Sequence, residues 1–358
     1  MSKIRVVVVD DSAVARKVLT EILKSDPGIE VVGVASDPCL ARDKIKKLNP
    51  HVITLDVEMP GMNGITFLRN LMRLRPMPVV MVSSLTKEGA EVTLDAMDFG
   101  AVDFVTKPAL DLTDPHANFG EDLIEKVKTA AGARVRRYAW DVALPEVAPK
   151  FSADAVLLKK PASRPFKTSE KIIAIGASTG GTEAVKEILA DMPADAPAIV
   201  VTQHIPKAFS GPFAQRMNKI SAMAVLEAED GQRIVPGHAY IAPGSHHLLV
   251  QRDGTHYVCH LHDGPAVNRH RPSVDVLFRS VAQNVGTNAV GVILTGMGVD
   301  GAAGLKELHD SGAPTLAQDE NTAVVWGMPG EAVKLGGVDH ILPLQRIGAE
   351  LLRLVKQL

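Results

Sequence analysis

At 358 residues the chain is longer than one ordinary domain, and its length predicts two. Apolar residues make up 46% of the sequence, charged residues 22%, and the net charge is −2. These values are typical of a globular protein, and nothing in the charge demands a nucleic-acid partner. No run of about 18 apolar residues occurs, so we expect no insertion into a membrane.

The N-terminal residues, MSKIRVVVVDDSA, contain only a short apolar run that ends in two aspartates, which is unlike a signal peptide. The two cysteines, Cys39 and Cys259, are far apart in the chain and do not indicate a disulfide framework. Both features favour a cytoplasmic protein, and we expect it to work as a monomer.

Residues 1–128 alternate short apolar runs with segments of helical periodicity. The predicted strands are 4–10, 30–35, 51–56, 78–83 and 102–106. Their continuous Val and Ile runs are typical of strands buried on both faces, which occur in parallel sheets. Five such strand–helix units predict a doubly wound α/β domain.

The composition changes over residues 129–167. Between 129 and 166 the chain has seven Lys and Arg against three Asp and Glu, with many alanines and several prolines. We expect the tail of a helix followed by an extended linker from about Ala139 to Phe166.

Residues 168–358 resume the α/β pattern and predict a second, larger domain. Its predicted strands are 171–177, 196–203, 238–243, 247–252, 256–261 and 289–296. The pair 247–252 and 256–261 flanks Asp253-Gly254, a strong signal for a β-hairpin. The expected fold class is therefore α/β, with two doubly wound parallel sheets and one antiparallel hairpin in the second domain.

Acidic residues follow the predicted strands of the first domain. Asp10 and Asp11 end the strand 4–10, Asp56 ends 51–56, Ser83 ends 78–83, and Lys107 follows 102–106. Function collects at the carboxyl ends of parallel strands, and three carboxylates there would repel one another unless a cation such as Mg²⁺ lay between them. The lysine and the hydroxyl are suited to hold a phosphoryl oxygen. The alternative, that the aspartates only cap helices, does not account for all five residues.

These motifs resemble a response-regulator receiver domain over residues 1–125. The motifs are VVDDS (8–12), LDVEMPGMNG (55–64), MVSS (81–84) and FVTKP (104–108). The resemblance implies a flavodoxin-like fold with Asp56 as the phospho-acceptor. It also implies a Mg²⁺ site formed by Asp10, Asp11 and Asp56, with the backbone carbonyl of Glu58 as a further ligand.

The same resemblance assigns roles to three more residues. Ser83 and Lys107 would contact the phosphoryl group, and Phe104 stands where the family has a switching aromatic residue.

The stretch GASTGG at 176–181, which follows the strand 171–177, permits four interpretations. A dinucleotide fingerprint would require glycine in place of Ser178 and an acid at the end of the next strand, which ends in Gln203-His204. A phosphate-binding Walker loop would require a Gly-Lys-Ser/Thr sequence, which is absent. Ser178 could cap a helix that starts near Thr182, or it could be a nucleophile, which needs a base and an orienting acid.

Partners for a nucleophile are found at other strand ends. Among the twelve histidines His204 is distinctive because it ends the apolar strand 196–203, and Asp300 follows the strand 289–296. Asp275 and Asp319 are weaker candidates, since neither ends a buried strand. The histidines of the hairpin, His256, His260 and His262, could bind a metal, but a solvated face is the favoured interpretation because no thiolate or acid completes the spacing.

Residues 168–358 resemble the catalytic domain of chemotaxis protein-glutamate methylesterases. The motifs are IGASTGG (175–181), QHIP (203–206), AYIAPG (239–244), RPSVDVLF (271–278) and LTGMGVDGAAG (294–304). The resemblance implies Ser178 as nucleophile, His204 as base, Asp300 as orienting acid and the Met297 backbone as an oxyanion donor. It implies no cofactor at the esterase site.

Taken together, the two resemblances imply a phosphorylation-activated hydrolase that demethylates glutamyl methyl esters of chemoreceptors and deamidates specific receptor glutamines. The implied partners are methyl-accepting chemoreceptors and a chemotaxis histidine kinase. The alternative is a response regulator with a nucleotide-binding or DNA-binding output domain. A DNA-binding output is not favoured, because residues 167–358 carry 16 basic against 19 acidic residues.

Overall fold

The computed structural model describes residues 3–57, 59, 64–83, 87–107, 119–133, 152–159 and 170–358. The chain divides into two compact units, Met1–Leu144 and Pro145–Leu358, and each is considered by itself. Within the described residues, no helix combines the length and the apolar character needed to cross a membrane.

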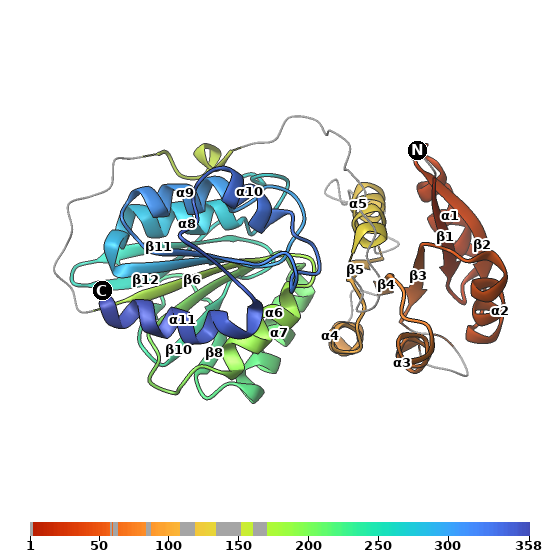
Figure 1. Ribbon diagram of the computed structural model, residues 1–358, viewed down its shortest axis with the longest axis horizontal. Coiled ribbons are helices and arrows are strands. Elements are labelled where there is room, and N and C mark those ends of the chain that lie inside the picture. Colours follow the sequence, from red (N-terminus) through yellow and green to blue (C-terminus); the bar gives the residue numbers. More distant parts are fainter. Residues whose placement is uncertain are drawn as a thin grey trace. The chain divides into compact units, whose positions relative to one another are not determined.

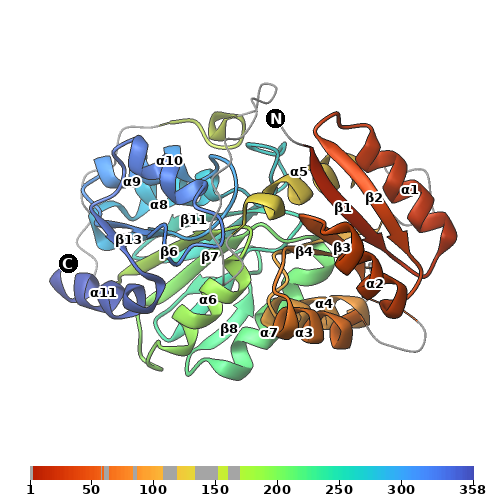
Figure 2. The same cartoon turned by 45° about the vertical axis from the view of Figure 1, so that its right-hand side comes forward.

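The first unit is a five-stranded parallel sheet with helices on both faces. Its strands are β1 (Ile4–Val9), β2 (Ile29–Ala35), β3 (Val52–Asp56), β4 (Val79–Ser83) and β5 (Asp103–Thr106). Its helices are α1 (Ala13–Lys24), α2 (Pro38–Leu48), α3 (Gly64–Leu74), α4 (Lys87–Asp98) and α5 (Phe119–Gly132). The strand order is β2-β1-β3-β4-β5, the flavodoxin-like order. Helices α1 and α5 cover one face, and α2, α3 and α4 cover the other (Figures 1 and 2).

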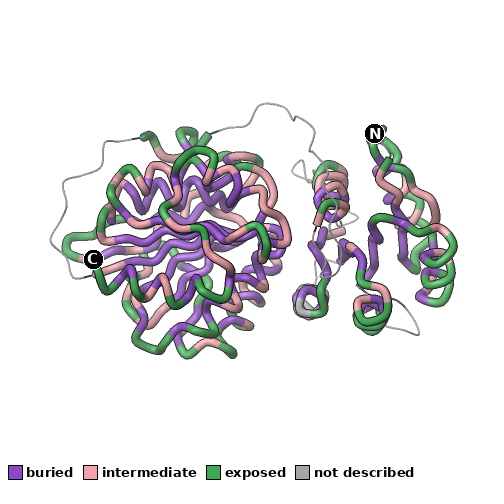
Figure 3. The backbone as a smooth tube through the Cα atoms, in the orientation of Figure 1, coloured by how far each residue is buried: buried purple, intermediate pink, exposed green. Residues whose placement is uncertain are grey.

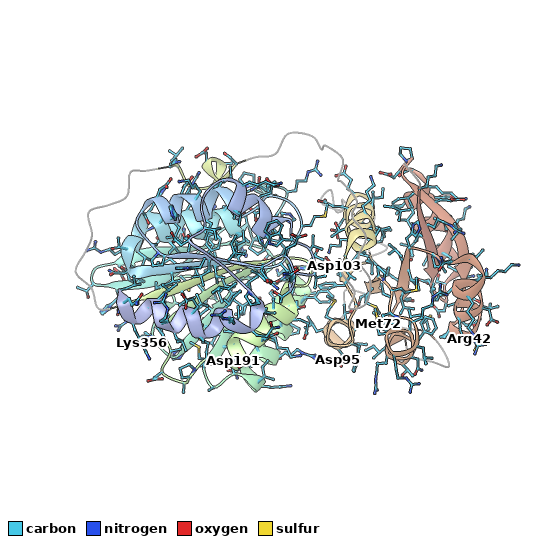
Figure 4. The ribbon with its side chains drawn as sticks, in the orientation of Figure 1. Arg42, Met72, Asp95, Asp103, Asp191 and Lys356 are labelled. Carbon is cyan, nitrogen blue, oxygen red and sulfur yellow. The ribbon has the colours of Figure 1, made fainter. Side chains whose placement is uncertain are left out.

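Burial of the central strands explains why this sequence forms a parallel sheet. Every residue of β3 and β4 is buried, and the four valines of β1 are at most 1% exposed. Asp103, labelled in Figure 4, is the first residue of β5, and its Oδ1 lies 3.4 Å from Lys126 Nζ of α5. The predicted fold of this domain is confirmed, and the parallel arrangement brings the ends of β1, β3, β4 and β5 to one edge.

The second unit is built on a seven-stranded parallel sheet of order β15-β14-β13-β6-β7-β10-β8 and a three-stranded sheet of order β11-β12-β9. The strands of the large sheet are β6 (Ile172–Ala177), β7 (Ala198–Gln203), β8 (Ala224–Glu227), β10 (His238–Ile241), β13 (Ala289–Ile293), β14 (Thr315–Gln318) and β15 (His340–Leu342). The small sheet contains β9 (Arg233–Ile234), β11 (His247–Asp253) and β12 (His256–His262).

Six helices and two 3₁₀ turns complete the described part of this unit. They are η1 (Ala153–Ala155), α6 (Gly181–Ala190), α7 (Lys207–Ile220), α8 (Val274–Asn284), η2 (Gly286–Asn288), α9 (Ala302–Asp310), α10 (Met328–Lys334) and α11 (Leu344–Gln357). Helices α8, α9 and α10 lie on one face of the large sheet, and α6, α7 and α11 lie on the other (Figure 1). The buried residues are concentrated in the strands and on the helix sides that face them (Figure 3).

The antiparallel hairpin is confirmed, with one correction. Asp253 pairs with His256, so the two-residue loop is Gly254-Thr255 rather than Asp253-Gly254. Gly254 has φ +58°, a conformation that glycine adopts without strain. The loop is shifted by one residue because its first residue has a positive φ, and glycine adopts a positive φ with less strain than the aspartate before it or the threonine after it.

Residues 152–159, inside the predicted linker, pack on the second unit. The 3₁₀ turn η1 follows Ser152, and Ala153 is buried against Leu249 and Val276. Arg279 of α8 donates from one guanidinium nitrogen to Asp154 Oδ1 at 2.7 Å and to the Leu157 carbonyl at 2.8 Å. This part of the linker is therefore held by a buried arginine.

Candidate active site

Ser178 lies in a tight turn between β6 and α6. Its backbone N–H donates to the carbonyl of Thr295 at 3.0 Å, and its own carbonyl accepts from the N–H of Gly181 at 2.7 Å. Gly180 has φ +76°, and a Cβ there would lie 2.6 Å from Val324. The glycines therefore allow a turn that no larger side chain fits, and this turn places Ser178 at the end of β6.

His204 follows β7, the neighbouring strand. Its N–H donates to the carbonyl of Ala177 at 3.1 Å, which continues the pairing of β6 and β7 to the site. Gln203, only 3% exposed, donates from Nε2 to the carbonyl of Ser178 at 2.9 Å and to the carbonyl of His204 at 3.1 Å. One amide thus ties the turn of Ser178 to the strand end of His204.

The structure brings Ser178, His204 and Asp300 into one hydrogen-bonded chain. His204 Nδ1 lies 3.0 Å from Ser178 Oγ, and Nε2 lies 2.8 Å from Asp300 Oδ2. Since a carboxylate only accepts, the proton of the neutral imidazole belongs on Nε2, which leaves Nδ1 to accept from the serine hydroxyl. The two nitrogens have exchanged roles relative to the chymotrypsin-type triad, but the order nucleophile, base, acid is the same.

Asp300 is held at the N-terminal end of α8. Its Oδ2 accepts from the N–H of Val274 at 2.7 Å, and its Oδ1 accepts from Ser273 Oγ at 2.7 Å. Burial would raise the pKa of this carboxyl, but the hydrogen bond to His204 and the charges of His204 and His270 outweigh burial and hold the pKa well below its usual range. The acid is therefore ionised at neutral pH and can stabilise a protonated imidazole.

Several residues around the triad were not predicted from the sequence. The ring of His270 stacks on that of His204 with centroids 3.7 Å apart. Asn268 donates to both Asp300 and Asp275, the latter being one of the two weaker acid candidates. The sequence carries one usable signal, the motif RPSVDVLF, which contains Ser273 and Asp275, but no strand end marks these residues.

Met297, predicted to supply an oxyanion donor, lies in the loop after β13 between two glycines. Gly298 has φ +81°, and a Cβ on Gly296 would lie 2.8 Å from the Cβ of Ser178. The loop therefore approaches Ser178 closely because residue 296 has no side chain. The assignment of Met297 as donor stays a prediction.

The hairpin histidines, all within the described residues, do not form a metal-binding group, although the rings of His260 and His262 lie edge to face with centroids 6.2 Å apart. His256 Nδ1 lies 3.0 Å from Glu170, His260 Nδ1 lies 2.9 Å from Asp230, and His262 Nδ1 accepts from the N–H of Gly264. Among the described residues, the one group with a geometry suited to a metal ion is Asp10, Asp11 and Asp56.

The three aspartates form the predicted acidic site of the first unit. Each offers a carboxylate oxygen, and these atoms lie within 4.8 Å of one another. Lys107 Nζ is 2.9 Å from both Asp10 Oδ2 and Asp56 Oδ2. Burial opposes the charge of Lys107, but its hydrogen bonds and the two carboxylates raise its pKa. Oxygen donors at this separation fit Mg²⁺, whose charge would complete the neutralisation that one lysine begins.

The remaining receiver residues lie beside this site. Ser83 ends β4 and is buried, and its carbonyl accepts from the N–H of Lys107 at 2.7 Å. Phe104 is 4% exposed, and its ring faces Lys126 Nζ at 5.3 Å. Glu58, the predicted carbonyl ligand, lies outside the described residues.

Each of the two units matches a known protein family. The family model described as CheB methylesterase matches residues 173–351, and that described as response regulator receiver domain matches residues 6–114. A protein-glutamate methylesterase/protein-glutamine glutaminase of Hydrogenovibrio crunogenus is 57% identical and covers 100% of both chains. Its counterpart from Xanthomonas campestris pv. campestris is 58% identical over 99% of this chain and 98% of its own.

The chain belongs to the protein-glutamate methylesterase/protein-glutamine glutaminase family. This confirms the resemblance stated from the sequence, and the chain is an enzyme, a carboxylic ester hydrolase joined to a receiver domain. The crystal structure of the Thermotoga maritima CheB methylesterase catalytic domain is 37% identical, with a TM-score of 0.51, and covers 52% of this chain and 99% of its own. The second unit therefore has the fold of this methylesterase family.

Proposed function

We propose that this chain removes methyl groups from glutamyl methyl esters of chemoreceptors, deamidates specific receptor glutamines, and is activated by phosphorylation of Asp56. It would serve adaptation in chemotaxis and act in the cytoplasm, where the receptor helices that carry these groups are exposed. The single observation that supports the chemistry best is the hydrogen-bonded chain from Ser178 through His204 to Asp300.

The hydrolysis proceeds through an acyl-enzyme. Ser178 Oγ attacks the ester carbonyl while His204 Nδ1 takes the hydroxyl proton. The tetrahedral intermediate collapses when the C–O bond to the methoxy group breaks, and His204 returns the proton so that methanol leaves. A water molecule, deprotonated by His204, then attacks the acyl-enzyme and releases a glutamate carboxylate and the serine hydroxyl.

Deamidation uses the same steps. The leaving group is then ammonia, and the proton from His204 is needed to expel it because an amide nitrogen leaves poorly as an anion. In both reactions Asp300 fixes the imidazole and stabilises its protonated form. Backbone N–H groups near Met297 are the proposed donors to the oxyanion, since the N–H of Ser178 already donates to Thr295.

The first unit is the proposed control element. Asp56 would receive a phosphoryl group from a chemotaxis histidine kinase to form an acyl phosphate, with Mg²⁺ held by Asp10, Asp11 and Asp56 neutralising its charge. Lys107 lies within ion-pair distance of Asp56, and Ser83 ends the neighbouring strand, which supports the proposal that both contact the phosphoryl oxygens. Phe104 is the proposed switching residue.

The decisive experiment measures methanol release from methylated receptor membranes, with and without a small phosphodonor. Ser178→Ala should abolish release and leave phosphorylation of Asp56 intact. Persistent release by Ser178→Ala would contradict the nucleophile assignment. Asp56→Asn should keep basal release but lose the response to the phosphodonor, and an undiminished response would contradict the control mechanism.

A further inference from the structure

In two helices of the second unit, an aspartate at the N-terminal end of one helix accepts a hydrogen bond from the N-terminal turn of the other. Asp300, just before α9, accepts from the N–H of Val274 in the first turn of α8 at 2.7 Å. Asp275, in that first turn of α8, accepts from the N–H of Gly304 in the first turn of α9 at 2.7 Å. The N-cap residues of the two helices make no capping bond with their own side chains. Each helix is therefore capped by the acid of the other.

Asn268 links the two acids. Its Nδ2 lies 2.7 Å from Asp275 Oδ2 and 2.9 Å from Asp300 Oδ1. Asn268 has φ +50° and the next residue, Arg269, has φ +72°, a left-handed conformation that asparagine adopts more readily than most residues and that is costly for arginine. Asn268 and Arg269 are the two central residues of a tight turn that Val267 and His270 close with two backbone hydrogen bonds. This turn fixes the backbone of Asn268, and the turn directs its side-chain amide to the two buried carboxylates.

We propose that Asn268 and Asp275 are positioning residues that orient the carboxylate of Asp300 toward His204. This inference rests on the triad chemistry proposed above. Asp300 Oδ1 is held by Ser273 Oγ, by Asn268 Nδ2 and by the N–H of Asp275 at 3.3 Å.

With Oδ1 occupied by three donors, Oδ2 is directed to the N–H of Val274 and to His204 Nε2. Rotation of the carboxylate would break several of these bonds at once. Removal of the Asn268 amide loosens Oδ1 without touching His204, so its effect should appear in the rate of the chemical step.

The pair also predicts a pH effect. Burial, and then the charge of Asp300, raises the pKa of Asp275 to about 7. The titratable side chains near this pair of acids include His204 and His270, and His247 also interacts with Asp300. Above neutral pH Asp275 therefore adds a second buried negative charge beside Asp300, which lowers the stability of the fold.

The test uses the full-length enzyme and methanol release from methylated receptor membranes. Asn268→Gly removes the amide while keeping a residue that accepts a positive φ, and we expect kcat to fall about ten- to a hundredfold with KM within about twofold. Arg269→Gly is the matched control, because Arg269 has the same backbone conformation and an exposed side chain, and it should keep kcat within about twofold. Asp275→Asn alters the acid that Asn268 contacts beside Asp300, and it should lower kcat about three- to tenfold with KM within about twofold.

Two results would overturn the inference. One is a wild-type kcat in Asn268→Gly. The other is a loss of activity, in both variants, that is fully accounted for by the unfolded fraction measured in thermal unfolding. If Asp275→Asn does not fold, Asn268→Gly decides alone. Ser178→Ala distinguishes failure of the proposed triad from failure of the positioning role. Methanol release by Ser178→Ala would refute the triad. An inactive Ser178→Ala together with a fully active Asn268→Gly would refute only the positioning role.

Discussion

Replacement of Asp300 by asparagine gives the sharpest test of the triad. The carboxylate accepts from three donors at Oδ1 and from two at Oδ2, namely the N–H of Val274 and His204 Nε2. An amide has one oxygen, and that oxygen is best placed on the side with three donors. The NH₂ group then faces the N–H of Val274 and His204, so one buried donor loses its acceptor, at a cost of about 1–3 kcal/mol in stability.

The catalytic cost is larger because the imidazole changes its tautomer. The amide NH₂ donates to Nε2 of His204, which moves the ring proton to Nδ1, the nitrogen 3.0 Å from Ser178 Oγ. A protonated Nδ1 cannot accept the serine proton. In serine-protease triads this change lowers kcat by about 10⁴, which corresponds to about 5 kcal/mol in the activation barrier.

The assay is kcat for methanol release, measured beside Ser178→Ala as the inactive baseline and beside Asp319→Asn as a matched control. Asp319 Oδ1 instead accepts from the N–H of Thr322 at 2.9 Å. The kcat of Asp319→Asn should therefore stay within about threefold of the wild-type value. Circular dichroism and thermal unfolding establish that each variant is folded. A folded Asp300→Asn that keeps a tenth or more of the wild-type kcat would refute the assignment of Asp300 as the orienting acid.

Three further outcomes are expected. Gln203→Met removes the amide that donates to the carbonyls of Ser178 and His204, so kcat should fall by about tenfold or more and the melting temperature should drop; wild-type values for both would contradict this. The pKa of Asp275 is raised to about 7 in the folded protein, so its ionisation lowers the free energy of unfolding as pH rises from about 4 to 7. The difference in free energy of unfolding between Asp275→Asn and the wild type should therefore grow by about 2–3 kcal/mol between pH 5 and 8. A difference that does not change with pH would refute this prediction. Chelation of divalent cations should abolish phosphorylation of Asp56 and leave basal methanol release unchanged, and phosphorylation that survives chelation would argue against a metal at the acidic site.

The residues that the sequence could reveal are those at strand ends. Long apolar runs such as the four valines of β1 and IIAIGA of β6 are buried on both faces, and parallel order then brings the carboxyl ends of their strands together. Asp56 with Lys107, and Ser178 with His204, come together for this reason alone, although each pair is separated by at least 26 residues in the chain.

Other features depend on contacts that no local pattern records. Four strands of the second unit, β8, β9, β14 and β15, were missed because AVLE, RI, TLAQ and HIL are too short for a periodicity to be recognised. Asn268 precedes α8 in a loop, and its role follows only from the approach of α9 to α8. That approach requires Gly304, where a Cβ would lie 2.7 Å from the carbonyl oxygen of Asp275.

Each of the two sites contains a buried carboxylate whose negative charge must be stabilised. The groups that stabilise it differ, and the difference agrees with the chemistry proposed for each site. Asp56 is offset by Lys107, a single flexible cation that can follow a phosphoryl group when one is attached. Asp300 is offset by a helix N-terminus, two side-chain donors and an imidazole, all fixed by the fold. Five donors occupy its two oxygens, so Asp300 is a poor nucleophile and a good anchor. Only a rigid acid can hold His204 through two successive proton transfers, whereas a phospho-acceptor has to change partners.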